Sequence, residues 1–311
     1  MNSAVTDVLV IPTAETVFAS LNVYFRADMS PLAERSRLPS LVGRWLDSHA
    51  NEPFREEIRK YLRHHQIASD VHPRDELPHA PMRILESIGL GELERERFAS
   101  ATHGVAIGIR ERVRSRRIGL WATIATAAAL TEATSGVTVD PALPRVLPTS
   151  ALHRRVPADG AIHVGQHIVG IFSKARSGFG RITTSGMSKF GLPNLEASDV
   201  PQRLAKFDVV VKGVGQYLVD LILSSEDGHS DNSVVISDQI HLTIQQVAKA
   251  IAGHTDSSSA SNQYPVRLEF GPSTFYRDSV DMVHVLPPRS EQDKTGWIAE
   301  AIETLFGSES N

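Results

Sequence analysis

Residues 118–134 restrict the fold of this chain more than any other segment, because they are almost entirely apolar and rich in alanine. The weakly polar stretch at 118–133 is about 16 residues long and contains Glu132, so it is too short and too polar to cross the ~30 Å core of a bilayer. Its composition predicts a helix that ends in a left-handed cap at Ser135 and Gly136. The chain is therefore expected to fold around a buried helix.

The overall composition is typical of a globular protein, with 41% hydrophobic and 22% charged residues. The absence of cysteine excludes disulfides, thiolate nucleophiles, iron–sulfur clusters and cysteine-ligated zinc. No basic segment precedes the apolar residues of the N-terminus, and Asp7 and Glu15 interrupt them, which argues against a signal peptide. A cytoplasmic location is expected.

Charge is distributed unevenly along the chain. The net charge is −3 for residues 1–100, +8 for residues 101–190 and −9 for residues 191–311. Such asymmetry indicates either that the basic middle contacts acidic segments of the same chain or that it receives an anionic partner. Contact within the chain is the favoured interpretation.

Hydrophobic periodicity predicts an α+β fold, with a helical N-terminal region followed by a mixed sheet with packed helices. Leu38, Val42 and Trp45 recur at the spacing of one helix face, and a second helix is expected after Pro53. Further helices are expected at 82–88, 204–223, 243–252 and 291–306. Strands are expected at 5–11, 17–26, 98–109, 137–139, 167–172, 180–185, 234–242, 266–270 and 280–286.

Three prolines in residues 68–81 indicate a loop and place a domain boundary near residue 92. We expect a mostly helical region at 1–92 and an α+β domain at 93–311. A division of this domain into two similar halves, 93–225 and 226–311, is left open.

The histidines do not form a convincing metal site. One group, His64, His65, His72 and His79, lies in a segment with Pro73 and Pro78, which favours a solvated loop. His163 and His167 fall within an apparent strand, where this spacing would separate them by about 13 Å. No metal and no cofactor are predicted.

The sequence contains no recognisable catalytic motif. Gly213 and Gly215 begin a dinucleotide-binding pattern whose third glycine is missing, so close helix packing is the expected role of this segment. No catalytic residue is predicted, and whether the protein is an enzyme is left open.

Basic residues form the most unusual pattern. Alternating arginines of one strand share a face, and further cations surround a glycine-rich hairpin. Each of these two groups could bind phosphates or carboxylates. A solvated turn is the simpler interpretation. The candidate anion-binding residues are Arg110, Arg112, Arg114, Lys174, Arg176, Arg181 and Lys189.

Three segments resemble an uncharacterised bacterial family of α+β domains over roughly residues 95–225. They are Ala101-Thr102-His103-Gly104, the helix end at 133–141, and the motif at 183–196 that begins Thr183-Thr184-Ser185-Gly186. The resemblance implies an α+β domain and supplies no established activity.

The favoured hypothesis is a non-enzymatic, cytoplasmic interaction or regulatory protein whose basic central surface binds an acidic protein partner. The alternative is an enzyme or a nucleotide- or anion-binding domain that uses the basic hairpin at 174–189. Nucleic-acid binding has less support, because few aromatic residues lie between the charges. No membrane partner is predicted, and the oligomeric state is left open.

Overall fold

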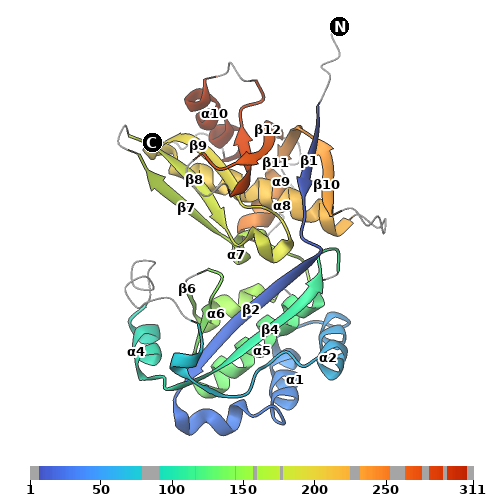
Figure 1. The fold of residues 1–311 in the computed structure, drawn as a ribbon, viewed down its shortest axis with the longest axis vertical. Coiled ribbons are helices and arrows are strands. Elements are labelled where there is room, and N and C mark those ends of the chain that lie inside the picture. The colour runs from blue at the N-terminus through green and yellow to red at the C-terminus, as the bar shows by residue number, and fades with distance from the viewer. Residues whose placement is uncertain are drawn as a thin grey trace. The chain divides into compact units, whose positions relative to one another are not determined.

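The protein has an α+β fold, as its sequence predicted, with helices packed on mixed sheets (Figure 1). The computed structural model describes residues 7–78, 91–115, 117–143, 145–156, 160–175, 178–224, 232–252, 263–274, 280–289 and 293–306. The chain divides into two compact units. Unit 1 comprises Met1–Val17 and His163–Asn311, and unit 2 comprises Phe18–Ile162. Along the chain, unit 2 is therefore an insertion within unit 1.

Unit 2 contains a five-stranded sheet with the order β3-β4-β2-β5-β6. Its strands are β2 (Thr16–Phe25), β3 (His72–Pro73), β4 (His103–Arg112), β5 (Val137–Asp140) and β6 (Arg145–Leu147). β5 pairs antiparallel with both β2 and β6, and β3 pairs antiparallel with β4. On β4, Val105 and Ile107 share a face and are fully buried.

Helix α5 (Ile118–Thr134) is buried along its length, which confirms the expectation from its composition. It contacts β4 and β5 and also packs against α1 (Leu38–His49), α2 (Phe54–His64) and α6 (Thr149–Arg155). Ser135 takes the left-handed conformation with φ of 49°, and Gly136 donates a backbone hydrogen bond to Thr131. The expected left-handed cap is therefore present, with serine in the left-handed position.

The start of α5 is capped by a carboxylate from β4. Glu111 lies on the same face of β4 as Val105 and Ile107, and its side chain accepts hydrogen bonds from the backbone nitrogens of Gly119 at 2.8 Å and Leu120 at 3.2 Å. A carboxylate at a helix N-terminus is favourable because it partners free N–H groups. The remaining helices of unit 2 are η1 (Ala27–Ala33), η2 (Arg74–Glu76) and α4 (Glu92–Ser100).

Unit 1 contains a six-stranded sheet with the order β11-β12-β13-β9-β8-β7 and a separate two-stranded ribbon of β1 and β10. Its strands are β1 (Val8–Pro12), β7 (Val169–Lys174), β8 (Phe179–Ser185), β9 (Leu195–Pro201), β10 (Ser233–Ser237), β11 (Gln239–Thr243), β12 (Gln263–Pro272) and β13 (Asp281–Leu286). β9 and β13 pair in parallel, whereas the other neighbours in the two sheets are antiparallel.

Helix α8 (Asp208–Ser224) packs on several strands of this sheet, and α9 (Ile244–Ala252) packs on α8. A Cβ added to Gly213 of α8 would lie only 2.6 Å from the side chain of Val247. This contact confirms the expected role of the glycine in close helix packing. Unit 1 also contains α7 (Val164–His167), η3 (Met187–Phe190), η4 (Gln202–Phe207) and α10 (Lys294–Phe306).

The compact units differ from the domains expected from the sequence. Residue 92 lies inside unit 2, where β2 pairs with β5 through the Val23–Thr138 register, so the sheet joins residues from both sides of the expected boundary. The expected halves 93–225 and 226–311 are likewise joined, because β9 and β13 are neighbours in one sheet. Residues 1–92 therefore do not form a separate helical unit.

The strand expected at 98–109 begins later than expected. Phe98 lies in α4, where it packs edge-on against Tyr24 with 5.2 Å between ring centroids, and β4 begins at His103. The strand expected from residue 167 begins at Val169, after the short helix α7. The helix expected at 82–88 lies outside the described residues. Within the described part of the chain, no helix is long and apolar enough to cross a membrane.

Candidate ligand pocket

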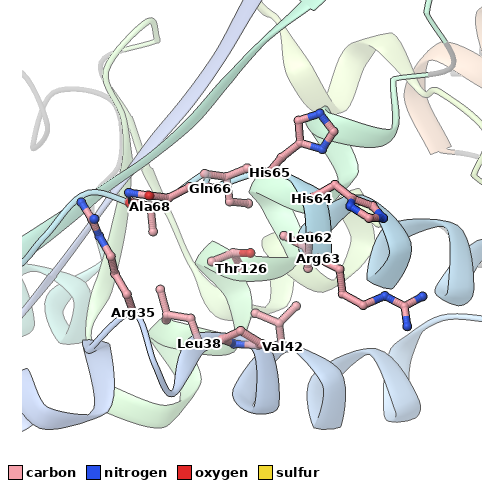
Figure 2. A pocket seen from close by; sticks show the side chains of 12 residues that line it. Arg35, Leu38, Val42, Leu62, Arg63, His64, His65, Gln66, Ala68 and Thr126 are labelled. Carbon is pink, nitrogen blue, oxygen red and sulfur yellow. Dashed lines mark hydrogen bonds between the residues drawn. The ribbon is translucent and has the colours of Figure 1, made fainter.

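A pocket of about 320 Å³ opens in unit 2 between α1, the end of α2, the segment that follows α2, and α5 (Figure 2). Its lining residues are Arg35, Leu38, Pro39, Val42, Leu62, Arg63, His64, His65, Gln66, Ile67, Ala68 and Thr126. All of them belong to a single unit, so the pocket depends only on the packing of that unit.

The walls of the pocket are apolar. Leu38 and Val42 lie one helical turn apart on α1 and are buried, while Ile67 and Ala68 are buried in the segment after α2. Leu62 contributes the last apolar side chain of α2. The same period that predicts α1 from the sequence thus places two of its apolar residues at the wall.

Thr126 is the polar group at the centre of this pocket, and Figure 2 shows it surrounded by the other labelled side chains. It projects from α5, is only 1% exposed, and its Oγ1 has no hydrogen-bond partner in the described part of the chain. A buried hydroxyl without a partner costs roughly 1–3 kcal/mol. A ligand with a donor or acceptor here would remove that cost.

The opening carries basic side chains. Arg35 forms an ion pair with Asp70, with 3.1 Å between Nε and Oδ1. When the amide oxygen of Gln66 is turned toward Arg35, it accepts a hydrogen bond from Nη1 of Arg35 at 2.8 Å. Figure 2 shows Arg63 and His64 on the side opposite Arg35. Cations therefore flank the pocket from two directions.

His65 is held at the end of α2 by its neighbours. Its ring stacks on Tyr61 with 4.1 Å between centroids, and its Nδ1 lies 3.0 Å from the backbone oxygen of Tyr61. Burial, together with the charge of Glu111, raises the pKa of Tyr61 to about 12. The phenol therefore stays neutral and supports the imidazole ring.

Three predicted anion-binding residues lie near the end of β4 in unit 2. Arg110 and Arg112 share one face of the strand, as expected, and both are exposed. Arg114 lies in the turn after β4 and is half-buried. The next described arginine, Arg117, is buried, and burial lowers its pKa to about 10 against the opposing effect of Glu111.

The predicted residues of the basic hairpin lie in unit 1. The β7–β8 register pairs Lys174 with Gly180 and Ser173 with Arg181, so Lys174 and Arg181 lie on opposite faces of the hairpin. Lys189 is 6% exposed, and its Nζ donates to the backbone oxygen of His167 at 3.4 Å. Arg176 lies outside the described residues. The described geometry does not bring these cations together on one face.

His163 and His167 lie at the two ends of the short helix α7, whereas the sequence had indicated a strand there. Nδ1 of His163 lies 3.0 Å from the backbone oxygen of Lys249. His167 is buried, and its ring packs against the ring of Phe190. His79 is not among the described residues. In the part of the chain that the structure describes, no three His, Asp or Glu side chains are arranged to hold a metal ion.

Comparisons of the chain with protein-family models, curated proteins and solved structures found no match. The resemblance to a bacterial α+β family therefore stays a prediction.

The sequence did not indicate the pocket, because its lining is assembled from three segments. His64 and His65 were assigned to a solvated loop, whereas His64 ends α2 and both side chains line the pocket. One local signal was available. Thr123 and Thr126 are hydroxyl residues in the middle of a helix that is buried along its length, and buried hydroxyls normally have a hydrogen-bond partner.

Proposed function

We propose that the protein is a binding protein that takes a small, mainly apolar molecule into the pocket of unit 2. The observation that carries this proposal is the unpartnered hydroxyl of Thr126 at the centre of an apolar pocket. Ligand sites are commonly apolar, with a few polar groups that orient the ligand. Thr126 has the position and chemistry of such an orienting group.

The dimensions of the pocket agree with a small ligand. Its volume of about 320 Å³ is at the lower end of the ~300–1,000 Å³ common for ligand sites. A bicyclic aromatic molecule or a medium-length acyl chain is of suitable size.

The neutral fluorescent probe N-phenylnaphthylamine tests the proposal, because it has an apolar body and one N–H donor for Thr126. Binding to the wild type should raise its fluorescence. Thr126→Val keeps the side-chain shape and removes the acceptor, so we expect binding about fivefold weaker, equivalent to ~1 kcal/mol for one hydrogen bond.

Thr123→Val provides a matched control. Thr123 lies one turn earlier on α5, is equally buried and also has an unpartnered hydroxyl, but it does not line the pocket. Its substitution should leave probe affinity unchanged. Equal effects of the two substitutions, or no probe binding to the wild type, would contradict the proposed site.

Arg110 and Arg112 support a second candidate function, the binding of an acidic partner in the cytoplasm. Both are exposed on one face of β4, and neither forms an ion pair with a described residue. Paired arginines are suited to carboxylates and phosphates. The second candidate function is thus the non-enzymatic interaction or regulatory protein expected from the sequence. Its basic surface would consist of Arg110 and Arg112, which is smaller than the sequence predicted.

An acidic peptide of glutamates tests this second function. Binding should weaken with salt and be lost in an Arg110→Glu/Arg112→Glu variant, whereas Arg44→Glu, at another exposed arginine, should retain it. If a single-stranded oligonucleotide binds much more tightly than the peptide, the partner class is nucleic acid instead.

A further inference from the structure

The side chains that line the proposed pocket combine basic and apolar groups. Among the described residues, its lining includes two arginines and two histidines but no aspartate or glutamate, while the buried walls are apolar. From this combination we propose that the ligand is an amphipathic carboxylate, whose apolar body carries a polar group that pairs with Thr126 and whose anionic group lies at the opening. This inference rests on the proposed binding function and specifies its ligand class.

The two arginines differ in how far their charge is already compensated. Arg35 is paired with Asp70 and held by Gln66. Arg63 is exposed and forms no ion pair with any described residue. The uncompensated charge at the opening is therefore that of Arg63, on the side opposite Arg35 (Figure 2).

The position of Arg63 determines how a carboxylate would bind. In Figure 2 its guanidinium points away from Thr126, so the charge lies at the opening and not among the apolar walls. A carboxylate can then remain hydrated beside Arg63 while its tail occupies the interior, which avoids the high cost of a buried ion. The attraction is modest because an exposed pair is screened by water and salt.

Three eight-carbon compounds separate the contribution of charge from that of the tail. Octanoate, octanol and octylamine have the same apolar chain and carry a negative, a neutral and a positive end at pH 7.5. Each is titrated against the full-length protein loaded with N-phenylnaphthylamine, and probe displacement is measured. Octanoate should displace the probe at a concentration about threefold below octanol, and octylamine should be the weakest.

Arg63→Gln should abolish most of the advantage of octanoate over octanol, measured as the ratio of the concentrations at which the two compounds displace the probe. Arg44→Gln is the matched control, because Arg44 is also exposed on a helix and unpaired among the described residues, but does not line this pocket. High salt should reduce the octanoate advantage of the wild type in the same way as Arg63→Gln.

The outcomes distinguish a wrong ligand class from a wrong pocket. If the probe binds and the three compounds displace it equally, the carboxylate class is wrong while the pocket stands. If Arg44→Gln reduces the octanoate advantage as much as Arg63→Gln, the effect is one of general surface charge and the assignment to this opening is wrong. If the probe does not bind the wild type, both proposals fail.

Discussion

Four threonines of unit 2 show how the same hydroxyl group can stabilise or destabilise a buried helix. Thr131 of α5 shares a hydrogen bond of 2.5 Å with Thr138 of β5, and both are buried. Thr123 and Thr126 are equally buried, but their hydroxyls have no partner among the described residues. The contribution of each threonine to the free energy of unfolding therefore depends on whether its hydroxyl has a hydrogen-bond partner.

We expect the replacement of threonine by valine to have opposite effects on the free energy of unfolding at two positions of α5. Thr123→Val removes an unsatisfied hydroxyl and should raise the free energy of unfolding by about 1 kcal/mol, whereas Thr131→Val leaves Thr138 without its partner and should lower it by about 1–2 kcal/mol. Urea denaturation followed by circular dichroism measures both. A loss of stability in Thr123→Val would mean that its hydroxyl is satisfied in solution.

At the scale of elements, α5 is expected to tolerate no charge along its buried length. Ala128 is 0% exposed, so Ala128→Asp would bury an unpaired carboxylate and should cost several kcal/mol, about 3 or more. Ala99→Asp, on the exposed face of α4 in the same unit, serves as the control and should change stability little. An unchanged melting temperature for Ala128→Asp would contradict the burial of α5.

Another link between elements involves Glu196 of β9, which is fully buried. Its carboxylate accepts hydrogen bonds from the Ser273 hydroxyl at 2.7 Å and the Thr274 hydroxyl at 2.6 Å, beyond the end of β12, and lies 3.6 Å from Nδ1 of His284. Burial raises its pKa, but the hydrogen bonds from Thr274 and Ser273 and the nearby histidine lower it more, so the pKa lies below the ordinary value of 4.5.

This lowered pKa predicts an acid-dependent loss of stability. Because the folded-state pKa is below the unfolded value of 4.5, the stabilisation is fully present above pH 4.5 and is lost as the pH falls through the folded-state pKa. Glu196→Gln should lower the free energy of unfolding by about 2–4 kcal/mol at pH 7 and flatten this dependence. Parallel pH profiles of wild type and Glu196→Gln would contradict the assignment.

Local patterns predicted most elements, because each pattern lies within one element. The apolar period of α1 and the composition of α5 identified both helices. The boundary near residue 92 was wrong because the pairing of β2 with β5 joins residues far apart in sequence, which no local pattern reports. The faces occupied by Lys174 and Arg181 could not be predicted for a related reason, since they depend on the register between β7 and β8. The pocket could not be predicted, because its lining forms only when three segments of the chain pack together.

At the scale of the whole molecule, the chain leaves unit 1 after Val17 and returns to it at His163. Unit 2 has its own sheet, its own buried helix and the complete proposed pocket. Residues 18–162 expressed alone should therefore unfold cooperatively and bind N-phenylnaphthylamine with the affinity of the full chain. Circular dichroism and probe titration measure this. A fragment without a cooperative transition would show that unit 2 requires unit 1.

The same connectivity has a consequence for synthesis on the ribosome. β1 is made before any of unit 2, but its partner β10 is made only after unit 2 is complete. At roughly 5–20 residues per second, that delay is on the order of ten seconds or more. During this time the nascent chain presents Val8, Leu9, Val10 and Ile11 as an unpaired apolar strand, a form that chaperones bind and that neighbouring chains could pair with. Unit 2 can fold during this interval, whereas unit 1 can fold only after residues 163–311 have been synthesised.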